Sequence, residues 1–257
     1  MSVELAYKID GPEDAPVLVL GNSLGTTIEM WEPQLPDLTR RFRVVRYDHR
    51  GHGGSPVPPG EYRLEDLGGD VLAMLDGLGL DRVHLGGLSL GGMVAMWIAI
   101  NAPQRVDRLA LLCTSAKLGP PEMWATRAET VKAQGTEAIA DLIVGRWFTP
   151  EYARRLPEVY SWARGLLTGI DAEGYAGCCA AVQHMDLLPD LESISAPALV
   201  IAGAQDPATP ADAHARWIAA GIPDSRLEIV PDAAHLANVE QPELVTRLLL
   251  EFLGGAP

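Results

Sequence analysis

The sequence Gly-Leu-Ser-Leu-Gly at residues 87–91 places the strongest constraint on how this chain can fold. Residues 82–85 before it are predicted to form a strand, and the residues after it have the spacing of a helix that ends before Pro103. A turn that joins a strand directly to a helix has little room for side chains, and the two glycines relieve that crowding. We therefore expect Ser89 at the tip of a tight turn, with its hydroxyl exposed above a helix N-terminus that favours negative charge.

Strand and helix signals alternate along most of the chain. We expect strands at residues 3–9, 17–20, 43–47, 82–85, 108–113, 197–202 and 226–230. We expect helices at residues 64–78, 212–219 and 242–252, in addition to the helix after Ser89. This alternation predicts the α/β class, with a mostly parallel central sheet and helices on both faces.

The alternation is interrupted between Gly119 and Leu188, where the sequence favours helices and offers no convincing strand. An insertion of this length between two core strands predicts a helical cap, the lid, over the carboxyl ends of the sheet, where ligands bind in open α/β sheets. The predicted domains are a core of residues 1–118 and 189–257 and a lid of residues 119–188. The alternative is a set of ordinary packing helices.

The formal net charge of −14 limits the partners of this protein. No basic stripe offsets the charge, so we expect neither nucleic acid nor an acidic membrane surface as a partner. An anionic small molecule would need a local cation, because the overall field repels it.

The three cysteines, Cys113, Cys178 and Cys179, do not fit a disulfide framework, because the number is odd and two are adjacent. The first residues lack the basic and apolar regions of a signal peptide, and no apolar run is long enough to span a membrane. We therefore expect reduced cysteines and a cytoplasmic protein. The sequence does not indicate an oligomeric state.

A serine hydroxyl is a weak nucleophile and needs a base within hydrogen-bond reach. Among the six histidines, His235 is the predicted base, because it follows the last expected strand at the same sheet edge as Ser89. His49 and His52, in the loop after another strand, are the alternatives.

The base in turn needs a carboxylate that orients its ring. Asp206 follows the next-to-last expected strand and lies between Ser89 and His235 in the sequence. The gap before Asp206 has room for the lid, and the gap after it has room for one helix and one strand. Asp232 is too close to His235 to reach back easily, and Asp186 belongs to the lid, so Asp206 is the predicted partner.

The tetrahedral oxyanion of acyl transfer needs a pair of hydrogen-bond donors. The predicted donors are the backbone N–H groups of Leu90, directly after Ser89, and of Leu24, in the loop after the strand at residues 17–20. A neighbouring N–H of that loop is the alternative to Leu24. The sequence has no cluster of metal ligands, and this chemistry needs no metal or organic cofactor.

These features together resemble the α/β-hydrolase superfamily over essentially the whole chain. In that superfamily the order along the chain is serine, acid, histidine, which Ser89, Asp206 and His235 follow. Residues 48–55, Asp-His-Arg-Gly-His-Gly-Gly-Ser, are similar to its structural turn after the fourth strand. The chain has Asn-Ser at residues 22–23 where the superfamily usually has His-Gly, but a backbone donor does not depend on these side chains.

Three separated segments are similar to the 3-oxoadipate enol-lactonase family. They are Asn-Ser-Leu-Gly-Thr at 22–26 with Met30-Trp31 and Pro33-Gln34, Gly-Gly-Leu-Ser-Leu-Gly-Gly at 86–92, and Gly-Tyr-Ala-Gly-Cys-Cys-Ala-Ala at 174–181. The resemblance implies opening of the lactone ring of 3-oxoadipate enol-lactone to give 3-oxoadipate, in the β-ketoadipate pathway of aromatic catabolism. Carboxylesterases and cofactor-free perhydrolases share the same triad and are the alternatives. A non-catalytic receptor, which could dispense with a triad residue, is the alternative from another class.

This lactone carries a free carboxylate, which would need a cation under the lid. Trp124 and Arg127 are three residues apart and would share a helix face, so one could contact the lactone ring while the other holds the carboxylate. Arg146 and Trp147 form the alternative pair, and Trp147 is also a predicted substrate contact. For any lid arginine, the competing interpretation is a solvated surface charge.

Overall fold

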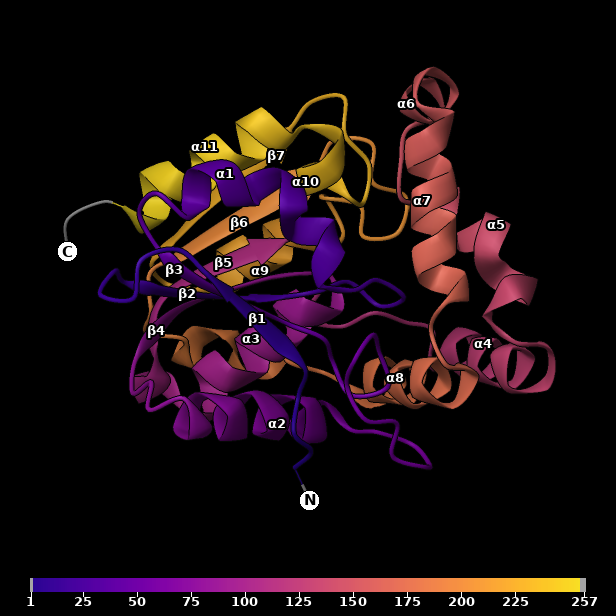
Figure 1. The fold of residues 1–257 in the computed structure, drawn as a ribbon, viewed down its shortest axis with the longest axis horizontal. Helices are drawn as coiled ribbons and strands as arrows, with labels where there is room; N and C mark the ends of the chain where they lie inside the picture. The colour runs from indigo at the N-terminus through magenta and orange to yellow at the C-terminus, as the bar shows by residue number, and fades with distance from the viewer. Residues whose placement is uncertain (1, 255–257) are drawn as a thin grey trace.

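A seven-stranded sheet forms the centre of the computed structural model, which describes residues 2–254 (Figure 1). The strand order is β1-β3-β2-β4-β5-β6-β7, in which β1 is antiparallel to β3 and the other neighbouring pairs are parallel. The strands are β1 (Tyr7–Asp10), β2 (Val17–Gly21), β3 (Arg43–Tyr47), β4 (Val83–Leu88), β5 (Val106–Leu112), β6 (Ala198–Gly203) and β7 (Ser225–Val230). The predicted α/β class with a mostly parallel sheet is confirmed.

Helices cover both faces of the sheet. Figure 1 shows α2 and α3 on one face and α1, α10 and α11 on the other. Their bounds are α1 (Leu35–Leu38), α2 (Leu64–Gly77), α3 (Leu90–Asn101), α9 (Ala215–Gly221), α10 (Ala237–Glu240) and α11 (Pro242–Leu253), with short 3-10 helices η1 (Ile28–Gln34), η2 (Pro103–Arg105), η3 (Thr136–Ile139) and η4 (Leu188–Ser193). The α11 helix buries Val245, Leu248 and Leu249, the spacing of a helix with one apolar face.

Five α-helices follow one another between β5 and β6 within residues 121–184, without an intervening strand. They are α4 (Pro121–Gln134), α5 (Ala140–Val144), α6 (Pro150–Arg155), α7 (Pro157–Thr168) and α8 (Ala172–His184). Proline begins three of them, where its missing N–H costs no helical hydrogen bond. Figure 1 shows these helices together beside one end of the sheet.

The register of the parallel strands aligns the loops that leave the sheet. Gly21 at the end of β2 lies opposite Gly87 in β4, and Gly203 at the end of β6 lies opposite Val230 at the end of β7. The loops that follow these four strands therefore begin at one edge. This is the edge at which the sequence places its candidate site residues.

Several boundaries differ from those expected. The first strand begins at Tyr7 rather than residue 3, because the N–H of Val3 donates to the Asp70 carboxylate of α2 at 2.8 Å instead of to a strand. The strand β4 continues to Leu88, since its glycines fit between β2 and β5. The strand β5 ends one residue early, because Cys113 has a φ of 42° and turns the chain out of the sheet.

Candidate active site

Ser89 lies in the turn between β4 and α3, with φ 54° and ψ −113°. A positive φ is unfavourable for a residue with a side chain, and surrounding contacts must hold it. The N–H of Ser89 donates to the carbonyl of Leu112 at 2.9 Å. A Cβ on Gly87 would lie 2.2 Å from the carbonyl carbon of Gly91, and a Cβ on Gly91 would lie 2.3 Å from that of Gly21. Only glycine fits at these two positions.

His235 and Asp206 meet where the loops after β7 and β6 converge, and both side chains are buried. The Nδ1 of His235 donates to Oδ2 of Asp206 at 2.8 Å. The hydroxyl of Thr209 donates to the same oxygen at 2.7 Å, and the N–H groups of Ala208 and Thr209 donate to the other oxygen at 2.8 and 3.1 Å. These bonds fix the carboxylate, so that a neutral imidazole keeps its proton on Nδ1 and leaves Nε2 as the acceptor.

The environment of Asp206 favours its ionised form. Burial alone would raise the pKa of the Asp206 carboxyl. The adjacent His235 and the hydrogen bonds from Thr209 offset burial and hold the pKa below its usual value.

The loop that carries His235 is bonded to the segment between α5 and α6. The N–H of Leu236 donates to the carbonyl of Trp147 at 2.9 Å. The buried Glu240 carboxylate accepts from the N–H of Ala234 at 2.9 Å and from the N–H of Thr149 at 3.1 Å, and the Thr149 hydroxyl also donates to it. One carboxylate thus holds two segments that are far apart in the sequence.

The two alternative histidines lie behind the site rather than in it. The Nε2 of His49 is 3.0 Å from the carbonyl of Asn22, and the Nε2 of His52 accepts from the N–H of Gly25 at 3.0 Å. Burial lowers the pKa of His49 to about 3 and that of His52 to about 4. Neither lines the pocket that contains His235.

The alternative carboxylates also lie elsewhere. Asp186 forms a surface ion pair with Lys117 at 2.6 Å. Asp232 is exposed, and its backbone carbonyl accepts from the side chain of Gln241 at 2.9 Å. Of the three carboxylates considered, only Asp206 is bonded to His235.

The turn at residues 23–26 places one backbone N–H beside the site. Thr26 N–H donates to Ser23 O at 3.1 Å, and Gly25 has φ 84°, as in a type II turn. The N–H of Ser23 contacts the sulfur of Met30, and the N–H of Gly25 donates to the imidazole of His52. The N–H of Leu24, in contrast, has no acceptor among the described residues. Within this turn the available donor is therefore that of Leu24.

Leu90 supplies a second N–H of this kind. It is the first residue of α3, so its N–H has no acceptor within the helix. Leu90 directly follows Ser89, and Ser23, Leu24 and Ser89 line one pocket.

That pocket joins the core to the helices between β5 and β6. Beside Ser89 and His235, its lining residues are Ser23, Leu24, Leu118, Met123, Trp124, Arg127, Ile143, Arg146, Trp147, Tyr175, Ala208 and Thr209. The Arg127 guanidinium stacks on Trp124, with its carbon 4.3 Å from the ring centroid. The structure thus brings Trp124, Arg127 and Trp147 together with Ser89 and His235.

Positive charge gathers at this pocket without a neutralising carboxylate. Arg127 and Arg146 are partly buried there, and neither forms an ion pair with an acidic side chain within residues 2–254. Burial raises the pKa of the Tyr175 hydroxyl, and the positive charge of the nearby Arg127 offsets part of this effect. By contrast, Arg164 on α7 pairs with Glu137 and Asp141.

Sequence reasoning missed Thr209, Tyr175 and Glu240. Thr209 could have been found, because a threonine three residues after a loop aspartate is placed to donate to it. Tyr175 belongs to the segment 174–181 that resembles the lactonase family, but its place in the pocket depends on how α8 packs against α4. Glu240 gave no local signal, since its partner Thr149 is 91 residues away.

Neither a metal site nor a membrane span is found in the part of the chain that the structure describes. In residues 2–254, no group of three or more His, Cys, Asp or Glu side chains could hold a metal ion. No helix in this range is long and apolar enough to cross a membrane.

The mostly parallel sheet and the pocket at the ends of its strands are typical of the α/β hydrolases, and comparisons with known proteins agree. Residues 16–242 match the family described as alpha/beta hydrolase fold, and the chain belongs to this family. It is 42% identical over 241 residues to 3-oxoadipate enol-lactonase 2 of Acinetobacter baylyi, across 94% of this chain and 90% of that protein. Among solved structures, it is similar to the enol-lactonase from Burkholderia xenovorans LB400, with 42% identity, a TM-score of 0.95, and 98% and 96% of the two chains covered. A thermophilic esterase from Thermogutta terrifontis is 33% identical, with a TM-score of 0.92 and 98% and 93% coverage.

Proposed function

We propose that this protein is a serine hydrolase that opens the lactone ring of 3-oxoadipate enol-lactone to give 3-oxoadipate, a step of the β-ketoadipate pathway. The observation that carries the proposal is the 2.8 Å bond between His235 and Asp206 in a site whose pocket also contains Ser89 and two unneutralised arginines. The named enol-lactonases, 42% identical over almost the whole chain, support the same substrate.

In the proposed mechanism, Ser89 Oγ attacks the ring carbonyl while His235 Nε2 accepts the hydroxyl proton. Asp206 holds the imidazole and stabilises the imidazolium that forms. The ring C–O bond then breaks, and His235 returns the proton to the leaving enol oxygen. The enol becomes a ketone, which makes ring opening effectively irreversible. Water then attacks the ester carbonyl on Ser89 while His235 accepts its proton. The bond to Ser89 Oγ breaks, and His235 returns the proton to that oxygen as the acid is released.

The N–H groups of Leu24 and Leu90 are the proposed donors to the oxyanion. Neither N–H has an acceptor among residues 2–254, so no bond within this range is lost when the negative charge forms. The dipole of α3 adds to this stabilisation, because its N-terminus lies at Ser89.

Arg127 is the proposed partner of the substrate carboxylate. A guanidinium matches a carboxylate in a bidentate geometry, and stacking on Trp124 limits its freedom before the substrate binds. Trp124 and Trp147 would then contact the lactone ring. Arg146 is the second cation of the pocket and the alternative partner.

We further propose that residues 119–188 act as a lid domain on a core of residues 1–118 and 189–257. The proposed partner is a small anionic molecule rather than nucleic acid, which the net charge of −14 disfavours. We also infer a cytoplasmic location, because the three cysteines are unpaired, as is usual in a reducing compartment.

The direct test is turnover of 3-oxoadipate enol-lactone beside neutral aryl esters by the purified protein. We expect kcat/KM for the lactone to exceed that for p-nitrophenyl acetate at least 100-fold. Comparable or better turnover of the aryl ester would instead favour the carboxylesterase alternative, which the esterase at 33% identity supports. Perhydrolase activity is checked by adding hydrogen peroxide and acetate. Absence of both turnover and fluorophosphonate labelling would favour a receptor.

A further inference from the structure

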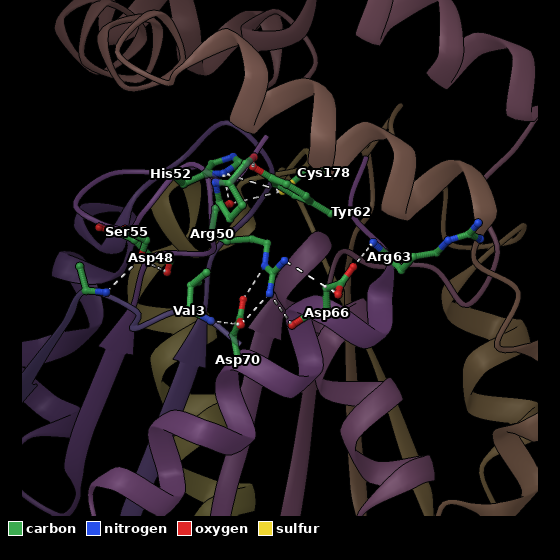
Figure 2. Close-up of polar contacts among 12 residues, drawn as sticks. Val3, Asp48, Arg50, His52, Ser55, Tyr62, Arg63, Asp66, Asp70 and Cys178 are labelled. Carbon is green, nitrogen blue, oxygen red and sulfur yellow. Dashed lines mark hydrogen bonds and ion pairs between the residues drawn. The ribbon is translucent and has the colours of Figure 1, made fainter. Parts of the chain in front are cut away.

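The loop at residues 48–55 contacts the turn at residues 23–26 through the side chain of His52. Figure 2 shows His52 beside Cys178 of α8, and Arg50 directed at Asp70 of α2. The Arg50 Nε donates to Asp70 at 2.6 Å in a buried ion pair. This pair fixes the 48–55 loop to the core, so the loop can serve as a rigid support for its neighbours.

His52 faces this turn as a hydrogen-bond acceptor. Its Nε2 lies 3.0 Å from the backbone nitrogen of Gly25, and the imidazole is only 1% exposed. A backbone N–H can only donate, so Nε2 carries no proton. The proton is on Nδ1, which faces the carbonyl of Arg50 at 3.4 Å and the sulfur of Cys178 at 3.9 Å. Burial keeps the pKa of His52 low, near 4, so the ring remains an acceptor at neutral pH.

We propose that His52 is a positioning residue for oxyanion stabilisation, acting on the Leu24 N–H through its bond to Gly25. Type I and type II turns differ by a flip of the central peptide, which in this turn is the peptide between Leu24 and Gly25. The His52 bond holds the N–H of that peptide away from the pocket. By fixing this peptide, the bond also fixes the direction in which the neighbouring Leu24 N–H points. This role rests on the proposed hydrolase function.

A second imidazole holds the other end of the same segment. The Nε2 of His49 donates to the carbonyl of Asn22 at 3.0 Å, and the N–H of Gly91 donates to the same carbonyl at 2.9 Å. Gly91 belongs to the turn of the candidate nucleophile, so Asn22 is fixed relative to it. The segment from Asn22 to Gly25 is thus held at both ends, and His52 supplies the end next to the proposed donor.

The 48–55 loop also contacts the lid. A Cβ on Gly51 would lie 2.4 Å from the Cα of Gly174, so the loop and the start of α8 touch backbone to backbone. Close to this contact, the thiol of Cys178 donates to the carbonyl of Arg50 at 3.6 Å. His52 therefore lies between a fixed part of the lid and the 23–26 turn.

The test compares His52→Leu with His52→Gln, using both the enol-lactone and p-nitrophenyl acetate. Leucine removes the acceptor, whereas the glutamine Oε1 can accept from Gly25 near the place of Nε2. We expect His52→Leu to lower kcat at least 10-fold on both substrates, with KM within about 2-fold, because the loss falls on the transition state. We expect His52→Gln to remain within about 3-fold of the unmodified protein.

A second readout separates positioning from a general structural effect. A boronic acid that forms a tetrahedral adduct on Ser89 should lose affinity in His52→Leu in proportion to kcat/KM, while adipate should keep its affinity. The matched control is His84→Leu, since His84 is also buried but lies at the start of β4, away from the Ser89 turn. This control should keep full kcat.

Two results would overturn the role of His52. One is equal kcat for the leucine and glutamine variants, and the other is an equal loss of boronic acid and adipate affinity. Failure of the proposed hydrolase activity is distinguishable, because the unmodified protein would then hydrolyse neither substrate, and the role of His52 would fall with it. Turnover of the aryl ester alone would overturn the lactone as substrate but would still allow the His52 variants to be compared on that ester.

Discussion

The carbonyl of Trp147 accepts a hydrogen bond from the N–H of Leu236 at 2.9 Å, which joins a wall of the pocket to the residue next to His235. The Glu240 carboxylate reinforces this junction through Ala234 and Thr149. The proposed base and the proposed substrate contact therefore share one direct connection.

Ser89→Ala is expected to lower kcat for the enol-lactone by about three or more orders of magnitude, because the proposed triad acts as a unit. The melting temperature should change little, since the variant loses a single oxygen atom. Intact mass after fluorophosphonate treatment should show one adduct on the unmodified protein and none on the variant. Full activity of the variant, or an adduct on another residue, would contradict the assignment of Ser89.

Asp206→Asn is expected to lower kcat by about three orders of magnitude, because an amide in place of the carboxylate favours the wrong tautomer of His235. Asp232→Asn is the matched control and should stay within about 2-fold. Steady-state kinetics on both variants make the comparison. A crippling effect of Asp232→Asn beside a silent Asp206→Asn would show that Asp232, and not Asp206, orients His235.

Arg127→Ala is expected to reduce kcat/KM for the anionic lactone 10-fold or more, which corresponds to about 1.4 kcal/mol of binding to the transition state. Turnover of neutral aryl esters should be spared, because they carry no carboxylate. Arg154→Ala, which removes an exposed arginine of α6, is the control and should affect neither substrate. Equal losses on both substrates would refute the carboxylate role, and a selective loss in Arg146→Ala alone would transfer that role to Arg146.

Acid is expected to destabilise the fold through the two buried histidines of the 48–55 loop. The pKa of His49 falls to about 3 and that of His52 to about 4 in the folded state, mainly because of burial. Their neutral forms are favoured by folding, so stability is complete above the unfolded value of about 6.5 and declines as pH falls toward 3, by up to about 1.4 kcal/mol per pH unit for each group.

Urea midpoints between pH 7.5 and pH 5 measure this effect. His49→Gln should flatten the decline relative to the unmodified protein, whereas His184→Gln, at a partly exposed histidine, should leave it unchanged. A His49→Gln profile parallel to that of the unmodified protein would contradict the prediction.

The sequence predicted best those features that depend on neighbouring residues. The turn at Ser89 could be predicted because a strand, two glycines and a helix encode it locally. The meeting of His235 with Asp206 followed from strand order, since parallel strands end at one edge. Glu240 could not be found, because a carboxylate held by Thr149 and Ala234 has no local pattern. The predicted start of the first strand was wrong, because the Asp70 carboxylate accepts a hydrogen bond from the N–H of Val3.

The contact between Gly51 and Gly174 attaches the helices between β5 and β6 to the core at one place. The two backbones touch without side chains between them, so this end of α8 is closely packed against the 48–55 loop. The bond between Trp147 and Leu236 attaches the same group of helices to the core at a second place. Moving these helices away from the core as one unit would break both contacts, whereas rotation of the side chains that line the pocket would break neither.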